Sequence, residues 1–117
     1  MREFDFENLS VYQRALDFTE KLFKISEKFP IKTQSSLGDQ LRRAGISIVN
    51  NIAEGSNKRS KKEKAQFFSY SLESARECVP MITISERLKY MDDDLHNNMR
   101  EECVVICKML SKLINVL

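Results

Sequence analysis

The chain has 117 residues, of which 31% are charged and 42% are apolar, and its formal net charge is +2. This length suits one domain that folds without a metal or disulfide, and the charge is far below that of a dedicated nucleic-acid-binding arm. No apolar run approaches the ~20 residues that a membrane span requires, so we expect no membrane partner.

The first predicted helix covers residues 10–29. Ser10 and Gln13 have the spacing of a capping box, in which the serine caps the helix and the glutamine reaches back. Pro30 ends the helix, because the residue before a proline is disfavoured in the helical region. The predicted core positions recur every three or four residues and are Tyr12, Ala15, Leu16, Thr19, Leu22, Phe23, Ser26 and Phe29.

The second predicted helix covers residues 36–54. Asp39 in its first turn suits the positive end of the helix dipole. Gly55 is placed to take the left-handed conformation that often ends a helix. The predicted core positions are Leu37, Leu41, Ala44, Ile48 and Ile52.

The third predicted helix covers residues 61–89 and follows a second capping-box pattern, Ser60 with Glu63. Pro80 lies inside it and removes one backbone donor. Because the apolar periodicity continues on both sides of Pro80, we expect a bend and not a break. The predicted core positions are Phe68, Leu72, Ala75, Val79 and Ile82.

The fourth predicted helix covers residues 93–116 and follows three aspartates at 92–94, which favour a helix N-terminus. Four amphipathic helices with short connections predict an all-α fold, a single-domain antiparallel up-down-up-down four-helix bundle. The last helix carries a heptad seam of Leu95, Met99, Cys103, Ile106, Leu110, Leu113 and Leu117.

The residues that support catalysis or metal binding in other proteins are sparse. Cys78, Cys103 and Cys107 form no CxxC pair and no Cys/His metal spacing, so we expect packing thiols and no metal. Their odd number and the lack of a signal peptide favour a cytoplasmic location. No nucleophile, metal cage or phosphate loop accompanies the single histidine, His96. We therefore expect no enzymatic activity and no cofactor.

Three of the predicted helices carry more apolar residues than one core-facing stripe needs. An exposed apolar surface usually marks an interface, which predicts a homo-oligomer. The alternative is that these residues widen the core or lie singly on the surface. They are Val11, Phe18 and Ile25 in the first helix, Ile46, Val49 and Ala53 in the second, and Val105, Met109 and Val116 in the last.

A row of four polar residues lines one stripe of the second helix, because its members are four, four and three residues apart. The favoured interpretation is a buried structural network in which Arg43 pairs with Glu77 while the hydroxyl and amide side chains satisfy one another. The alternative is a groove that binds an anion or nucleic acid. The row and its expected partners are Arg43, Ser47, Asn51, Glu54, Ser74 and Glu77.

Positive charge is concentrated before and in the first turn of the third helix. Residues 1–57 carry eight basic and eight acidic residues, whereas residues 58–64 carry five basic residues and one acidic residue. Clustered Lys and Arg side chains contact backbone phosphates, which predicts nucleic-acid binding; the alternative is a charged loop that only interacts with water. The candidate residues are Lys58, Arg59, Lys61, Lys62 and Lys64, with Arg42 considered as a sixth member.

Three motifs resemble one bacterial family. They are Phe6-x-x-Leu9-x-Val11-Tyr12-x-x-Ala15, Gln40-x-x-Arg43-Ala44 through Asn51-Ile52-Ala53-Glu54-Gly55, and Phe67-Phe68 through Ser74-x-x-Glu77. They are similar to those of four-helix-bundle proteins encoded in intervening sequences of 23S rRNA genes, relatives of the accessory variability determinant proteins of diversity-generating retroelements. The resemblance implies a four-helix bundle that forms a homopentameric ring. Gly45, Val49 and Pro80 depart from the family pattern.

The sequence thus predicts a non-catalytic, homo-oligomeric bundle that binds RNA, DNA or a ribonucleoprotein through a basic surface, as the retroelement relatives also suggest. The alternative is a homo-oligomeric scaffold that binds another protein and makes no direct contact with nucleic acid. A ring would multiply the modest charge of one protomer, because linked weak sites bind with avidity.

Overall fold

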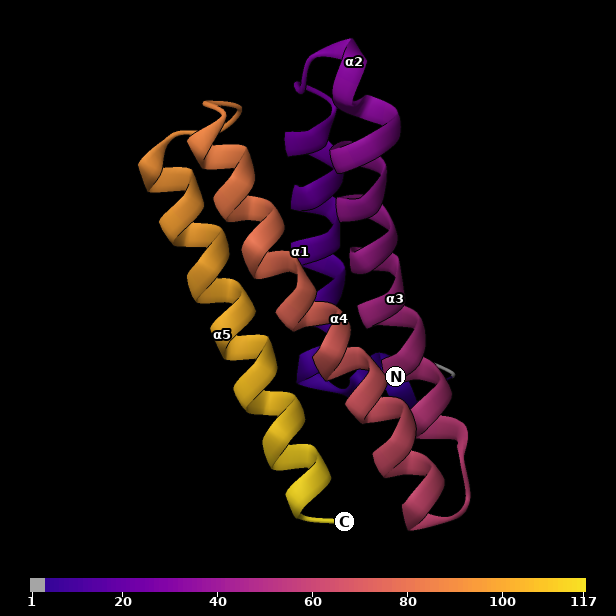
Figure 1. The fold of residues 1–117 in the computed structure, drawn as a ribbon. Coiled ribbons are helices and arrows are strands. Elements are labelled where there is room, and N and C mark those ends of the chain that lie inside the picture. Colours follow the sequence, from indigo (N-terminus) through magenta and orange to yellow (C-terminus); the bar gives the residue numbers. More distant parts are fainter. Residues whose placement is uncertain (1–3) are drawn as a thin grey trace.

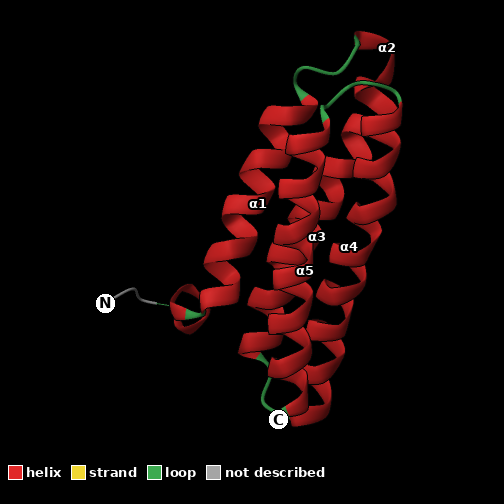
Figure 2. Ribbon diagram, turned by 90° about the vertical axis from the view of Figure 1, so that its left-hand side faces the viewer, coloured by secondary structure: helices red, strands yellow, loops and turns green. Residues whose placement is uncertain are grey.

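Four long helices lie side by side and alternate in direction along the chain (Figures 1 and 2). A computed structural model describes residues 4–117. The predicted all-α, antiparallel up-down-up-down four-helix bundle is confirmed, and residues 4–117 contain no strand. The elements are a 3-10 turn η1 (Asp5–Asn8), α1 (Ser10–Ser26), α2 (Ile31–Thr33), a π-helical turn η2 (Gln34–Gly38), α3 (Asp39–Asn57), α4 (Lys61–Arg87) and α5 (Asp93–Asn115).

One hydrophobic core runs along the bundle. At ~1.5 Å per residue, the 27 residues of α4 give a helix of about 40 Å, close to the 43 Å long axis of the molecule. The periodic core positions predicted for the last three long helices are buried or pack against the core. The exception is Leu117, which lies beyond the end of α5 and is half-buried. The largest side chains with at most 1% exposure are Phe18, Leu22, Leu41, Ile48, Ile52, Ile82, Met99, Ile106 and Leu110.

The packing face of α1 differs from the predicted one. Val11 and Phe18, which we assigned to a surplus stripe, are 4% and 1% exposed and belong to the core, whereas Leu16 is 38% exposed. Because α1 must face both α3 and α5, its buried stripe includes Val11, Ala15, Phe18 and Leu22. For this helix, the second apolar stripe therefore widens the core. No helix of residues 4–117 is both long enough and apolar enough to cross a lipid bilayer.

Both ends of α1 differ from the sequence prediction. Leu9, and not Ser10, is the N-cap, and no side chain caps the helix there. The η1 turn runs directly into α1, so the Gln13 amide reaches past Ser10 and donates to the Glu7 carbonyl at 2.9 Å. The helix ends at Ser26, three residues before the predicted end. The side-chain amide of Gln34 donates to the carbonyls of residues 26, 27 and 29, at and just beyond this end, where the regular hydrogen bonds of the helix stop.

The helical segment that leads into α3 begins at Ile31, five residues before the predicted start. Its last residues also differ from the prediction, since α3 continues through Gly55 to Asn57 and no glycine has positive φ. Gly55 is buried in the helix, and a Cβ atom there would lie 2.7 Å from two ring atoms of Phe68. The glycine therefore permits a close approach of α4 and does not end the helix.

The predicted starts of α4 and α5 are confirmed. Glu63 N–H donates to Ser60 Oγ at 3.0 Å, and Leu95 N–H donates to Asp92 Oδ1 at 2.8 Å. The exposed Pro80 lies within a single unbroken helix, as expected. Helix α4 ends at Arg87, two residues early, because Lys89 adopts a left-handed conformation with φ of 66° that turns the chain toward α5.

Candidate nucleic-acid interface

Five cations gather where α3 passes into α4, at the lower end of the bundle in Figure 1. The Ser60 cap sets the direction in which α4 begins and so holds the lysines of its first turn at this end of the molecule. The structure thus brings together the five clustered residues named from the sequence. We call Lys58, Arg59, Lys61, Lys62 and Lys64 the basic end.

Three cations of the basic end are available to a ligand. Arg59, Lys61 and Lys62 are exposed, and none of them pairs with another side chain within residues 4–117. The N-terminal end of a helix carries a partial positive charge, which adds to the charge of Lys61 and Lys62 in the first turn of α4. The resulting positive potential favours an anionic ligand.

The other two cations also hold the local structure. Lys58 Nζ lies 3.7 Å from Glu54 Oε2 and 4.9 Å from the centre of the Phe67 ring. Lys64 Nζ donates to the carbonyl of Ser56 at 3.0 Å, in the last turn of α3, where a cation suits the negative end of the helix dipole. These contacts attach α4 to the end of α3, so the basic end is a defined surface.

Arg42 does not belong to the basic end, contrary to the sixth position considered from the sequence. Its Nη1 donates to Ser26 Oγ at 2.8 Å and to Gln34 Oε1 at 3.2 Å, and its Nη2 donates to the Gln34 carbonyl at 2.8 Å. The sixteen residues between positions 42 and 58 correspond to about 24 Å along α3. Arg42 therefore joins α1 to the start of α3 at the opposite end of the bundle.

Three members of the predicted polar row and its expected partners are joined by hydrogen bonds. Ser47 Oγ and Ser74 Oγ lie 2.7 Å apart, across the contact between α3 and α4. Asn51 Nδ2 donates to Ser47 Oγ at 3.1 Å and to the Ser47 carbonyl at 2.9 Å. These bonds satisfy polar groups that are half-buried or buried, so this part of the row specifies how the two helices pack.

The predicted pair of Arg43 with Glu77 is wrong. The Arg43 side chain is 78% exposed, and its Nε donates to Asp39 Oδ2 at 2.7 Å, one turn earlier in the same helix. Asp39 is within reach of Arg43 on the helix surface, so the arginine needs no buried partner. The hydroxyls of Ser47 and Ser74 pair with each other, and the row therefore contains no buried charge. Glu54 pairs with Lys58 at 3.7 Å and lies outside the network. Arg43, Ser47, Ser74 and Glu77 nevertheless line one open groove of about 500 Å³.

The cysteines and the histidine have structural contacts. Cys78 and Cys103 are completely buried, and their thiols approach the carbonyls of Ser74 and Ala75 at 3.5 and 3.7 Å. The neighbouring Cys78 thiol and burial raise the pKa of Cys103, which keeps it protonated. The side chain of His96 lies 3.2 Å from the Thr83 hydroxyl. Among residues 4–117, no His, Cys, Asp and Glu cluster is arranged to hold a metal ion.

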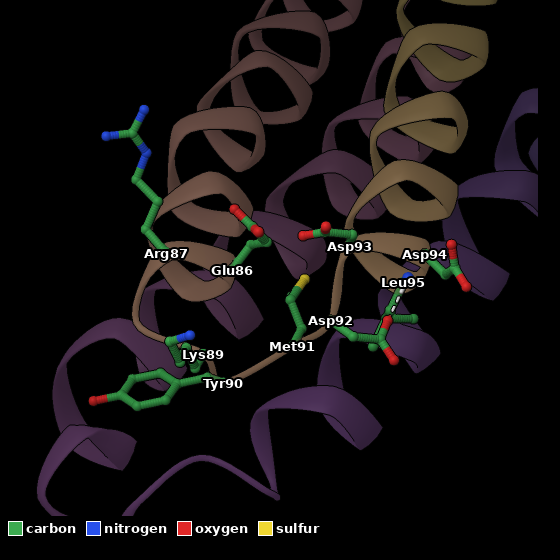
Figure 3. Close-up of a pocket in the computed structure, with 9 residues that line it drawn as sticks. All are labelled: Glu86, Arg87, Lys89, Tyr90, Met91, Asp92, Asp93, Asp94 and Leu95. Atoms are coloured by element: carbon green, nitrogen blue, oxygen red, sulfur yellow. Dashed lines mark hydrogen bonds between the residues drawn. The ribbon is translucent and has the colours of Figure 1, made fainter.

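The connection between α4 and α5, at the end of the bundle opposite the basic end, carries four carboxylates (Figure 3). An open cleft of about 970 Å³ surrounds the connection between α4 and α5. Figure 3 shows Glu86 and Asp93 facing each other across it, and their hydrogen bond raises the pKa of Glu86. The carboxylates outnumber the two cations that also line the cleft, so the cleft repels phosphates, and we call it the acidic cleft. The cleft is lined by Glu86, Arg87, Lys89, Tyr90, Met91, Asp92, Asp93, Asp94 and Leu95.

Sequence reasoning missed two features. It gave no role to Gln34, whose amide and carbonyl groups join the end of α1 to Arg42. It also gave no role to the aromatic pair Phe67 and Tyr70, which lies next to the basic end on α4. The signal for the second feature was present, because Lys62, Gln66 and Tyr70 are spaced four residues apart and therefore share one stripe of a helix.

Comparison with known families decides the relationship that the motifs suggested. Residues 7–112 match the family model described as 23S rRNA-intervening sequence protein. The chain belongs to this family. The chain is also similar to the solved structure of a protein of unknown function from the S23 ribosomal protein family of Bacteroides thetaiotaomicron. That similarity covers 90% of this chain and 95% of the other, with 22% identity and a TM-score of 0.81, and it shows the shared fold. A comparison with curated proteins found no match.

Proposed function

We propose that this member of the 23S rRNA-intervening sequence protein family is a non-catalytic, homo-oligomeric bundle that binds nucleic acid through its basic end. The observation that carries the proposal is the set of three exposed, unpaired cations, Arg59, Lys61 and Lys62, among residues 4–117. Lys and Arg side chains are the groups that neutralise backbone phosphates, and unpaired ones do so without breaking an existing ion pair.

The charge distribution along the bundle supports one orientation of the ligand. The basic end and the acidic cleft lie at opposite ends of a molecule whose long axis is 43 Å. This separation is several times the ~8 Å over which physiological salt screens exposed charges. A phosphate chain near the basic end therefore experiences its attraction with little opposition from the acidic cleft, despite the small net charge of +2.

Assembly into a homo-oligomer is part of the proposal, and a pentameric ring is the form that the family resemblance suggests. Exposed apolar side chains on several helices support it, because a monomer gains nothing from leaving them in water. In a ring the basic end is repeated, so sites that are weak alone bind one nucleic acid with avidity. The exposed apolar residues on the long helices and just after α5 include Leu16, Ile46, Ile84, Leu88, Val104 and Val116.

The test is charge reversal at the three unpaired cations. The triple variant Arg59→Glu, Lys61→Glu, Lys62→Glu should lose nucleic-acid binding in a fluorescence anisotropy titration at low salt. Its stability should be unchanged or slightly raised, because glutamate suits the first turn of α4. A matched control reverses Lys21, Lys28 and Lys32, which are also exposed and unpaired within residues 4–117.

The control variant carries the same change in net charge and should retain binding. Equal losses in both triple variants would show that net charge alone attracts the ligand and would contradict a defined basic end. Retained affinity in the first variant would also contradict the proposal. Thermal melting of both variants, followed by circular dichroism, confirms that they remain folded.

A second candidate function is a homo-oligomeric scaffold that binds another protein. The observation that favours it is a mainly apolar groove of about 340 Å³ between the start of α1 and the end of α5. Apolar grooves of this kind accept side chains from a partner helix. This function becomes the better explanation if the wild-type chain binds neither RNA nor DNA at low salt. The groove is lined by Leu9, Ser10, Val11, Met109, Lys112, Leu113 and Val116.

A further inference from the structure

An aromatic surface lies directly beside the basic end on α4. The rings of Phe67 and Tyr70 meet edge to face, with their centres 5.6 Å apart and an angle of 79° between their planes. Because Lys58 Nζ lies 4.9 Å from the centre of the Phe67 ring, the Lys58 ammonium and the centre of the Tyr70 ring are within about 10.5 Å of each other. The cations and the rings therefore form one continuous surface.

Tyr70 is the exposed part of this aromatic pair. Its residue surface is 40% exposed, whereas Phe67 is half-buried under Lys58. The amide of Gln66 donates to the Tyr70 hydroxyl at 2.7 Å, which holds the ring along the side of α4. Because Lys62, Gln66 and Tyr70 lie on one stripe of the helix, the ring is held in line with an exposed cation of the basic end.

A single-stranded nucleic acid offers the two chemical groups that this surface fits. Its unpaired bases stack on exposed aromatic side chains, and its phosphates contact Lys and Arg. In a duplex the faces of the bases are already stacked on one another, so Tyr70 would have no base to receive.

We propose that Tyr70 stacks on a base of single-stranded RNA or DNA while Arg59, Lys61 and Lys62 contact the phosphates of the adjoining strand. This inference rests on the proposed nucleic-acid binding and narrows the ligand to single strands. Both RNA and DNA carry the base and the phosphate that the surface recognises.

The charges around Tyr70 also define the direction of the strand. Glu73 and Glu77 follow Tyr70 along the exposed side of α4 and repel phosphates. The strand therefore runs from Tyr70 toward the connection between α3 and α4. There the unpaired Arg59, Lys61 and Lys62 outnumber Glu63, whose carboxylate accepts a hydrogen bond from the Ser60 hydroxyl at 3.1 Å. It does not continue along α4 toward the acidic cleft.

A contact with another copy of this chain explains the exposed Tyr70 ring less well than a single-stranded nucleic acid does. The centre of a protein interface is depleted in charged residues. Tyr70 lies beside Lys58 and Lys62, so an interface centred on it would remove these cations from water. An anionic strand is attracted by the same charges.

The experiment measures affinity by fluorescence anisotropy with labelled oligouridylate and oligothymidylate of about 20 nucleotides, a length that exceeds common single-strand site sizes. A labelled duplex of equal length is the competing ligand. The variants are Tyr70→Leu, which removes the aromatic face, and Tyr70→Phe, which keeps it. The matched control is Ile31→Ala, because Ile31 is 91% exposed and lies in α2, at the end of the bundle away from the basic end (Figure 1).

Wild type should bind at least one of the two single strands more tightly than the duplex. Tighter binding of oligouridylate identifies the ligand as RNA, and tighter binding of oligothymidylate identifies it as DNA. Tyr70→Leu should lose about fivefold or more in affinity for that strand, as expected for one lost base stack. Tyr70→Phe and Ile31→Ala should retain the wild-type affinity. The duplex affinity should not change in Tyr70→Leu.

Three results would overturn the inference. Base stacking would be excluded if wild type bound the duplex as tightly as the single strands or more tightly, or if Tyr70→Leu kept the wild-type affinity. The proposed nucleic-acid binding would still hold if the charge-reversal variant lost its affinity for nucleic acid. A change in particle mass of Tyr70→Leu, measured by light scattering, would assign the ring to a contact between copies. If wild type binds no nucleic acid, the proposed function itself fails.

Discussion

The contact between Gly55 and helix α4 gives the sharpest test of the packing described here. Gly55 in α3 faces the ring of Phe68 in α4, and a Cβ atom at position 55 would lie 2.7 Å from both Cδ1 and Cε1 of that ring. Phe68 is only 3% exposed, so its ring has no free space into which to move. The variant Gly55→Ala therefore adds the smallest possible side chain at the position with the least room.

The expected effect combines two opposing contributions. Overfilling a well-packed core typically costs about 1–3 kcal/mol of stability, since buried side chains or backbone must shift. Replacing a helical glycine by alanine restores about 1 kcal/mol at most, and less near a helix end. Gly55→Ala should therefore lower the free energy of unfolding by about 1–2 kcal/mol.

The assay is denaturant unfolding followed by circular dichroism at one fixed protein concentration. Gly45→Ala is the matched control, because a Cβ at position 45 would meet side-chain atoms of Thr19 and Leu22 at 3.0–3.1 Å, a much milder crowding. It should change stability by less than about 0.5 kcal/mol, since crowding and helix propensity nearly cancel. In a Phe68→Leu background, the cost of Gly55→Ala should fall because the ring atoms are gone.

A stabilised Gly55→Ala protein would refute this reasoning. Such a result would mean that α3 and α4 are further apart than described, and that Gly55 acts only as a poor helix former. An undiminished cost in the Phe68→Leu background would likewise locate the crowding elsewhere.

Three further predictions concern the polar side chains and the thiols. Arg42→Ala should destabilise by about 2–3 kcal/mol, because it removes three charge-assisted hydrogen bonds that two guanidinium nitrogens donate at a half-buried site. Arg43→Ala should cost less than about 0.5 kcal/mol, the value of an exposed ion pair within a helix, and thermal melts compare the two variants. Ser47→Ala and Ser74→Ala should each cost about 0.5–1.5 kcal/mol, and the double variant should cost less than their sum in denaturant unfolding. Alkylation of the native protein should modify Cys107 first, because this thiol is half-buried while the other two are completely buried. Mass spectrometry after limited reaction identifies the modified cysteine. Earlier labelling of Cys78 or Cys103 would contradict the packing.

The features that depend on periodicity could be predicted from the sequence. The four long helices follow from apolar spacing and capping residues, which are local signals. The same signals were ambiguous for α1, where two apolar stripes overlap and only the position of α3 and α5 selects Val11 and Phe18 over Leu16 for the core. Local patterns contain no information about which neighbouring helix a stripe will meet.

The arginines and Gly55 show the same limit. Arg42 and Arg43 are consecutive, so their side chains point about 100° apart around the helix, and only the path of α1 and η2 decides which one is enclosed. Gly55 suits either a helix end or a close helix contact, and the ring of Phe68 in another helix determines which applies. The basic end was predictable because five of seven consecutive residues carry the charge. The role of Tyr70 required the packing of Phe67 and Lys58.

The most direct test of the central claim, that the basic end binds nucleic acid through its phosphates, is the salt dependence of oligouridylate affinity. A site that contacts three phosphates of a single strand should give a slope of about −2 in a plot of log association constant against log salt concentration. The slope should approach zero in the variant Arg59→Glu, Lys61→Glu, Lys62→Glu. A wild-type affinity that is independent of salt, or no binding at low salt, would contradict the account.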